Sequence, residues 1–193
     1  AGALPTGQEI ARIESEPLTE VLRDMLKYST NVTAECVGLT ASGARGLEAS
    51  ATAMSDWVKA TFGVEVQLHD HSGLGGDSRV TAGGIVRMLR AAKGLKPILR
   101  DVGMKDDKGR VIDGHPVKVL AKSGTLNFVS GLAGHIVPPS GRELVFAIFT
   151  GDPARRDAVP VALREEAEGA GAWTKRARRL QGQLISRWAG AYG

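Results

Sequence analysis

Residues 117–126 read Val-Lys-Val-Leu-Ala-Lys-Ser-Gly-Thr-Leu and open the part of the chain that predicts a sheet. Three apolar runs, at residues 117–121, 126–137 and 144–150, are rich in the residue types that favour strands. Short joints at Gly124-Thr125 and at residues 138–141 separate them. Such closely spaced strands predict an antiparallel meander.

The tetrapeptide Lys122-Ser123-Gly124-Thr125 lies at a predicted strand end and combines a positive charge, hydroxyl groups and a residue without a Cβ atom. An ammonium group and a hydroxyl group both donate hydrogen bonds to anions, and Gly124 lets another backbone come close. A strand of this kind can hold an extended peptide while Lys122 and Ser123 bind its terminal carboxylate. On these residues alone, a solvated lysine followed by a bulge glycine is the simpler explanation.

The bulk composition indicates a folded chain that forms one domain or one large lobe. It has 193 residues, 42% of them hydrophobic, and a net charge of +4. Cys36 is the only cysteine, which excludes an intrachain disulfide and zinc-finger spacing, and its apolar surroundings predict a buried, inert thiol. No apolar stretch has the length of a membrane span, and residues 1–7 lack the features of a signal peptide.

Basic residues collect near the C-terminal end, at Lys175, Arg176, Arg178, Arg179 and Arg187. Aromatic residues make up only 5% of the chain and form no stacking pattern with these cations, so we expect no nucleic-acid partner. A nucleic-acid binder that uses the final helix is a third, weaker hypothesis, which a steep salt dependence of DNA binding would support.

Helices are predicted before the meander. Apolar residues recur at helical spacing from Leu18 to Leu26, and the pattern stops at residues 28–31. A second helix is expected at residues 32–40 and a third at 47–61, the latter with Met54, Trp57 and Val58 toward the core. Alternation at residues 64–68 predicts a strand, and a further helix is expected to begin at Thr81.

The last predicted helix spans residues 172–188 and is expected to cover one face of the sheet. Its apolar stripe consists of Trp173, Ala177, Leu180, Leu184 and Trp188. The fold class is therefore α+β, with a mainly helical portion at residues 15–93, an antiparallel sheet at 117–152 and a closing helix at 172–188.

Three short motifs stand in a fixed order along these elements. They are Ser29-Thr30-Asn31 in a turn between helices, Asp70-His71-Ser72-Gly73-Leu74 in a glycine-rich loop, and Lys122-Ser123-Gly124 in the sheet. An S-x-N element paired with a K-[ST]-G element is typical of penicillin-binding proteins and β-lactamases. With the D-x-S-G-L loop, residues 16–152 resemble the D-alanyl-D-alanine carboxypeptidases of the DacB type, peptidase family S13. The resemblance implies the C-terminal part of a penicillin-binding domain.

One departure from this family is large. The family's nucleophile is the serine of an S-x-x-K motif, and no serine between Ser15 and Ser186 has lysine three residues later. The nucleophile is therefore none of the serines of this chain. We expect the chain to be the C-terminal part of a longer protein, whose N-terminal part would be its partner in the active site.

The resemblance also implies roles for individual residues. Ser29 would relay a proton to the leaving D-alanine nitrogen, and Asn31 would bind the substrate's peptide carbonyl and the base lysine. Lys122 would set the electrostatic potential of the pocket, while Ser123 would bind the substrate carboxylate and Gly124 would leave room for the substrate. The backbone N–H of Thr125 would be one oxyanion-hole donor. Asp70 and Ser72 would shape the loop near the site.

His69-Asp70-His71 could form a metal site, because alternate residues of a strand share a face. No third potential ligand follows at a sequence spacing typical of metal sites, and there is no H-E-x-x-H motif. We therefore expect no metal and no organic cofactor.

The first functional hypothesis is part of a serine-type D-Ala-D-Ala carboxypeptidase, or also endopeptidase, that acts on peptidoglycan stem peptides ending in D-Ala-D-Ala. The resemblance implies acylation by β-lactams and a periplasmic or other extracytoplasmic location. The chain by itself would be inactive. The alternative is a non-catalytic peptidoglycan-binding module, or a degenerate relative, that binds the same D-Ala-D-Ala terminus. The sequence encoded upstream of Ala1 discriminates between the two, since only the enzyme needs an S-x-x-K motif there.

Overall fold

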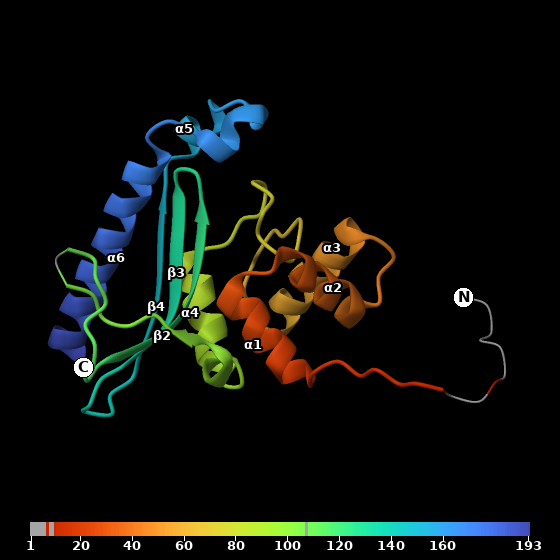
Figure 1. Ribbon diagram of the computed structural model, residues 1–193, viewed down its shortest axis with the longest axis horizontal. Coiled ribbons are helices and arrows are strands. Elements are labelled where there is room, and N and C mark those ends of the chain that lie inside the picture. The colour runs from red at the N-terminus through yellow and green to blue at the C-terminus, as the bar shows by residue number, and fades with distance from the viewer. Residues whose placement is uncertain (1–6, 8–9, 107) are drawn as a thin grey trace.

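The computed structural model describes residue 7, residues 10–106 and residues 108–193, and it places helices on both faces of one antiparallel sheet (Figure 1). Four helices precede the sheet: α1 Leu18–Tyr28, α2 Asn31–Ser42, α3 Leu47–Phe62 and α4 Ala82–Ala91. Two shorter helices and the long α6 follow it: α5 Pro153–Asp157, the 3-10 helix η2 Val161–Glu166 and α6 Ala170–Tyr192. The predicted α+β class is confirmed.

The predicted helices of the N-terminal part are observed, with ends shifted by at most two residues. Glycines in the left-handed region end α2 at Gly43 and α3 at Gly63, where a residue without Cβ avoids strain. Val58 of α3 is buried, but Trp57 is 58% exposed, so its predicted core position is wrong. Trp57 instead packs edge-to-face on Phe62 at the end of its own helix.

The predicted strand at residues 64–68 is wrong. This segment makes one isolated bridge, between Gln67 and Arg79, and joins no ladder. Val64 is buried against α4. A Cβ atom added to Gly84 of that helix would lie 2.6 Å from the Val64 Cγ1 atom. The alternation therefore reflects burial of one side of an irregular segment.

The sheet has the strand order β1-β2-β3-β4, and all neighbours are antiparallel. Its strands are β1 Arg100–Asp101, β2 Lys118–Leu126, β3 Val129–Val137 and β4 Leu144–Gly151; the 3-10 helix η1 Lys96–Ile98 precedes β1. The predicted meander corresponds to β2, β3 and β4, whereas the two-residue β1 was not predicted.

The predicted joint at Gly124-Thr125 is wrong, because both residues lie inside β2. Gly124 pairs with Gly131 of β3, and the ladder continues to Leu126 and Val129. The chain turns at residues 127–128, where Phe128 takes a positive φ of 59°. Phe128 is only 1% exposed and packs edge-to-face on Trp173 of α6, so tertiary packing rather than a glycine fixes this turn.

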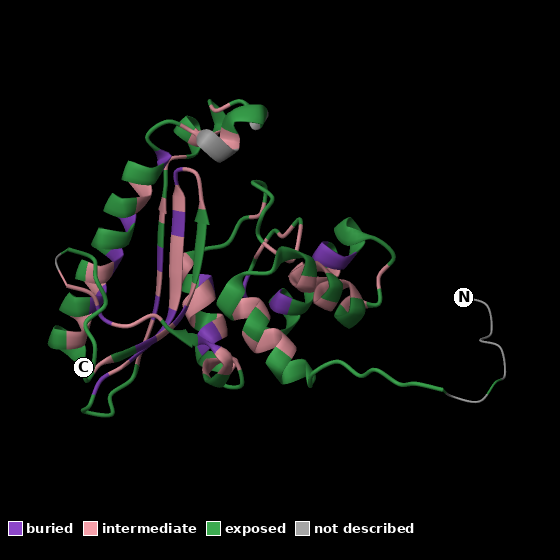
Figure 2. Ribbon diagram, viewed as in Figure 1, coloured by how far each residue is buried: buried purple, intermediate pink, exposed green. Residues whose placement is uncertain are grey.

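The main core lies between the sheet and α6, and α4 packs on the sheet's other face (Figures 1 and 2). The buried residues of the main core are Met104, Val119, Ala121, Ile136, Phe146, Ile148 and Ile185. The prediction that the closing helix covers one face is confirmed, but Leu180 is 45% exposed. Gln181, four residues after the buried Ala177, turns inward instead and donates a hydrogen bond to the buried Ser130.

The described part of the chain contains no helix with both the length and the apolar character needed to cross a bilayer.

Candidate active site

The edge of β2 is only partly covered. β1 pairs with Leu120 and Ala121, and the N–H of Val102 donates to the carbonyl of Val119 at 2.9 Å. Backbone groups of alternate residues point to the same edge of a strand. The N–H and C=O groups of Ser123 and Thr125 therefore point to this same edge, beyond the end of β1, where an extended peptide can pair with them.

Lys122 lies at this open stretch of edge. Its Nζ atom donates to the Ser29 Oγ atom at 2.5 Å and to the Ser123 carbonyl at 2.6 Å. Burial lowers the pKa of the Lys122 ammonium group, because desolvation disfavours its charged form. Among the residues that the structure describes, no carboxylate forms an ion pair with it. An anion that binds beside Lys122 would therefore meet a charge with no competing acidic partner.

Ser29 reaches Lys122 from the turn between α1 and α2. It caps the C-terminus of α1 in the left-handed region, with φ 57° and ψ 50°, and its N–H donates to the carbonyl of Met25. This conformation is uncommon for a residue other than glycine, and such residues cluster at functional sites. Asn31 follows as the first residue of α2 and is exposed. The structure thus joins two predicted site residues, Ser29 and Lys122, while the contact of Asn31 with substrate stays a prediction.

Side chains of β2 alternate between the two faces of the sheet. Lys122 lies toward α1, whereas Ser123 and Thr125 line a cavity of about 290 Å³ beside α6. In this cavity the Arg178 guanidinium donates to the Thr125 Oγ1 atom at 3.2 Å. Arg178 was not predicted as a site residue, since nothing in the sequence distinguishes it from the other cations of the final helix.

The loop at residues 70–76 is ordered by its own side chains. The Asp70 carboxylate accepts hydrogen bonds from the N–H groups of Gly73 at 2.8 Å and Gly75 at 2.6 Å. The Ser72 hydroxyl accepts one from the N–H of Leu74 at 3.4 Å. Both contacts are consistent with the expected shaping of the loop by Asp70 and Ser72.

Glu35 attaches this loop to α2 and was missed by the sequence analysis. Its carboxylate accepts from the N–H groups of His71, at 3.1 Å, and Ser72, at 3.0 Å. Burial alone would raise the pKa of Glu35, but the hydrogen bonds from Ser72 and from the backbone amides lower it below its usual value. Glu35 lies one helical turn after Asn31, so spacing on one helix face was the signal that could have found it.

The two histidines weighed as metal ligands lie in different environments. The His71 ring hydrogen-bonds Ser50 at 2.7 Å and contacts the Met54 sulfur at 3.4 Å, whereas His69 is exposed. Within residues 10–106 and 108–193, no group of three or more His, Cys, Asp or Glu side chains is placed to hold a metal ion.

Cys36 is exposed, so its predicted burial is wrong. It shares the outer face of α2 with Val32 and Thr40, which are also exposed. The apolar composition around Cys36 therefore did not indicate which face of the helix is covered.

The profile of the D-Ala-D-Ala carboxypeptidase 3 (S13) family matches residues 2–169. Carboxypeptidase DacB of Mycolicibacterium smegmatis is 32% identical over 179 residues, which cover 79% of this chain and 38% of that protein. A carboxypeptidase of Mycobacterium tuberculosis is 29% identical over 172 residues, covering 79% of this chain and 37% of that protein. The chain thus spans less than two fifths of the length of these curated relatives.

Solved structures share the fold. Penicillin binding protein 4 (dacB) from Haemophilus influenzae, complexed with a β-lactam, superposes with a TM-score of 0.58 at 20% identity, over 89% of this chain and 42% of that chain. A predatory endopeptidase from Bdellovibrio bacteriovorus, acylated by penicillin G, superposes with a TM-score of 0.59 at 19% identity, over 89% and 46%. At these identities the likeness shows the arrangement of helices and sheet.

Proposed function

Because this chain belongs to the D-Ala-D-Ala carboxypeptidase 3 (S13) family, we propose that it forms the substrate-binding side of the active site of a serine-type D-Ala-D-Ala carboxypeptidase. The observation that carries the proposal is the position of the Lys122 ammonium group. It lies between the Ser29 hydroxyl and the Ser123 carbonyl, at the part of the β2 edge that β1 leaves uncovered.

The substrate would be a peptidoglycan stem peptide that ends in D-Ala-D-Ala and lies extended along the edge of β2. Main-chain hydrogen bonds to Ser123 and Thr125 would hold the peptide, as in other strand-addition complexes. Lys122, on the face toward α1, would attract its terminal carboxylate, and Ser123, on the opposite face of β2, would bind that carboxylate from the other side. Gly124 fits such a substrate, since a Cβ atom added there would meet no other heavy atom within 4 Å.

The chemistry would begin with a serine outside these 193 residues, in an S-x-x-K motif. Its hydroxyl would give its proton to the lysine of that motif, and its oxygen would attack the carbonyl carbon between the two D-alanines while the N–H of Thr125 stabilises the developing oxyanion. The C–N bond would then break, and the leaving D-alanine nitrogen would take a proton from the Ser29 hydroxyl, which would in turn recover one from the protonated lysine of that motif. Ser29 accepts a hydrogen bond from Lys122, which leaves its own proton free for this donation. Water would hydrolyse the acyl-enzyme.

Two further properties belong to this proposal. A β-lactam would acylate the same serine. Cleavage of a cross-linked stem peptide would be an endopeptidase activity of the same site. An enzyme with either substrate would work outside the cytoplasmic membrane, where peptidoglycan is located. No step of this mechanism calls for a metal or an organic cofactor.

The second candidate is a peptidoglycan-binding module without catalysis. One observation favours it: no serine of the chain has the S-x-x-K spacing, although the groups that would hold a carboxylate are present. The two candidates differ in whether a preceding segment of the same protein carries S-x-x-K.

Labelling with a fluorescent penicillin tests the proposal. The full-length protein that carries this chain should form a covalent, heat-stable labelled band, and the isolated 193 residues should form none. Labelling of the isolated chain would contradict the external nucleophile. Absence of labelling in a folded full-length protein that still binds D-Ala-D-Ala peptides would instead favour the binding module.

A further inference from the structure

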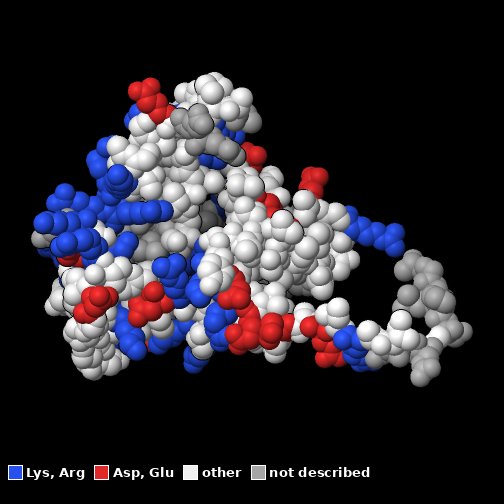
Figure 3. Space-filling model, viewed as in Figure 1, with Lys and Arg blue, Asp and Glu red and all other residues white. Residues whose placement is uncertain are grey.

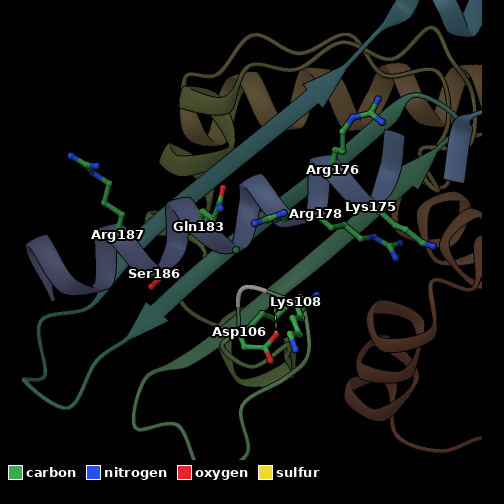
Figure 4. Close-up of a pocket in the computed structure, with 12 residues that line it drawn as sticks. Asp106, Lys108, Lys175, Arg176, Arg178, Gln183, Ser186 and Arg187 are labelled. Atoms are coloured by element: carbon green, nitrogen blue, oxygen red, sulfur yellow. Dashed lines mark hydrogen bonds between the residues drawn. The ribbon is translucent and has the colours of Figure 1, made fainter. Parts of the chain in front are cut away.

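A groove lies between α6 and residues Lys105, Asp106, Lys108 and Gly109 of the segment that precedes β2 (Figure 4). Its volume is about 1200 Å³. Seven of its lining residues are cations: Lys105, Lys108, Lys175, Arg176, Arg178, Arg179 and Arg187. We call this feature the basic groove. All of its α6 residues lie beyond residues 2–169, the part that the family profile matches.

The basic groove carries a large excess of positive charge. Asp106 is the one acidic residue among its described lining residues, against seven cations, while the net charge of the whole chain is only +4. Figure 3 shows the resulting cluster of basic side chains over α6. The 23 residues of α6 include no aspartate or glutamate, so this helix offers its cations no partner of its own.

Asp106 does little to neutralise α6, because its carboxylate is engaged within its own loop. It accepts hydrogen bonds from the N–H groups of Lys108 and Arg110 and pairs with the Arg110 guanidinium at 2.8 Å. These hydrogen bonds, that of the Arg110 backbone above all, lower the pKa of Asp106, so it stays ionised and bound to Arg110. Among the described residues, no carboxylate forms an ion pair with the α6 cations of the groove.

Clustered like charges repel one another, and a bound polyanion relieves the repulsion while releasing its own counterions. The α6 cations extend from residue 175 to residue 187, a helical length of about 18 Å. Four of these cations lie within residues 175–179, about 6 Å of helix, and Arg187 lies about 12 Å beyond them. The groove thus presents several charges rather than one, as a ligand with successive anionic groups requires.

The rest of the lining narrows the class of polyanion. Among the lining residues that the structure describes, none is aromatic, so bases would find no surface on which to stack. None of these described lining residues has a large apolar side chain, which disfavours insertion into a lipid bilayer. Arginine and lysine both bind phosphate oxygens well. We propose that the basic groove binds a flexible phosphodiester polymer without bases, of the polyol phosphate class.

This inference does not depend on the proposed peptidase activity, but the two sites adjoin. Arg178 lines the groove and also donates a hydrogen bond to Thr125 on β2. A polymer bound in the groove would therefore lie next to the strand that is proposed to hold the peptide.

The test is a titration of fluorescent poly(glycerol phosphate) with the full-length protein that carries this chain, followed by anisotropy at several salt concentrations. A variant with Lys108→Gln, Lys175→Gln and Arg179→Gln removes one cation from the loop and two from α6. We expect binding about tenfold to hundredfold weaker at low salt, from three exposed contacts. The salt dependence should become shallower by roughly one counterion per lost phosphate contact.

A control variant removes three exposed cations that do not line the groove, by Arg45→Gln, Arg90→Gln and Lys93→Gln. It should bind as the unaltered protein does. Equal weakening of both variants would mean that only net charge matters and would overturn the site. Absence of polymer binding would overturn it too, as would tighter binding to a single-stranded oligonucleotide of equal charge or to phosphatidylglycerol vesicles.

Discussion

The Lys122 Nζ atom lies 2.5 Å from the Ser29 Oγ atom, although 93 residues separate the two in sequence. One residue belongs to the sheet and the other to the turn between α1 and α2, so their hydrogen bond joins the two parts of the candidate site. The ammonium group makes its second hydrogen bond to a carbonyl of its own strand. It is thereby held in place by neutral acceptors, which preserves its charge for an incoming anion.

Replacement of Lys122 should separate function from stability. Lys122→Met in the full-length protein is expected to slow acylation by penicillin by about two orders of magnitude, the usual loss for one preorganised donor. Because burial lowers the pKa of Lys122, the folded state carries a cost for keeping it protonated at neutral pH, and methionine removes that cost. The free energy of unfolding should therefore stay equal or rise.

Stopped-flow acylation and urea unfolding measure these two effects. Lys118→Met, at the exposed first residue of the same strand, is the matched control and should alter neither. A loss of stability in Lys122→Met that parallels its loss of acylation would refute the assignment.

Two substitutions at Ser29 separate its hydroxyl from its backbone conformation. Ser29→Ala and Ser29→Gly both remove the acceptor of Lys122, so both should lower kcat/KM for a D-Ala-D-Ala peptide by about 10²-fold or more. Glycine tolerates the φ of 57° without strain, so Ser29→Gly should be more stable than Ser29→Ala by up to about 1 kcal/mol. Full turnover in Ser29→Ala would remove Ser29 from the proton path.

Replacement by alanine should affect the free energy of unfolding very differently at two glycines of the sheet. A Cβ atom on Gly124 meets open space, so Gly124→Ala should change the free energy of unfolding by less than about 0.5 kcal/mol while weakening peptide binding. A Cβ atom on Gly134 would lie 2.1 Å from the Leu120 carbonyl oxygen and 2.6 Å from the Ala121 Cα atom. Gly134→Ala should cost about 1–3 kcal/mol or more, because β2 and β3 must move apart.

Thermal unfolding together with peptide-binding isotherms checks both variants. Gly124 would lose its assigned role if Gly124→Ala bound D-Ala-D-Ala peptides as tightly as the parent protein.

Glu143 should make stability depend on pH. Its carboxylate hydrogen-bonds Lys96 and the buried His135, the latter at 2.6 Å, and the bond from Lys96 above all lowers its pKa below the usual 4.5. A carboxyl group with a lowered pKa in the folded state stabilises the fold fully above its usual pKa. This stabilisation is lost as the pH falls through the lowered value.

Glu143→Gln should therefore cost about 1 kcal/mol at pH 7, a modest value because Lys96 and Glu143 are both partly exposed. The difference from the unaltered protein should shrink steadily below about pH 4.5. Urea unfolding across this range gives the measurement, with Glu16→Gln at an exposed position as control. A difference that is constant with pH would show that the carboxylate's charge contributes nothing.

The sequence predicted those helices and strands that are determined by residues close together in the chain. Apolar residues at helical spacing from Leu18 to Leu26 correctly predicted α1, and Thr81 correctly marked the start of α4, where its hydroxyl accepts from the N–H of Gly84. The strand prediction at residues 64–68 failed, because alternation records which side is buried and does not supply a partner strand. The turn at Phe128 was missed, since its positive φ is stabilised by contacts with Trp173 and Arg155 from distant parts of the chain.

By itself, the sequence determined which residues form the motifs, the positions of α1 to α4, of β2 to β4 and of α6, and the concentration of cations near the C-terminal end. Only the tertiary structure decided which of these groups meet. It brought Ser29 to Lys122, tied the loop at residues 70–76 to Glu35, and set Arg178 beside Thr125. The physical reason is that composition and periodicity report on the nearest few residues, whereas these contacts depend on how helices and sheet pack together across the whole chain.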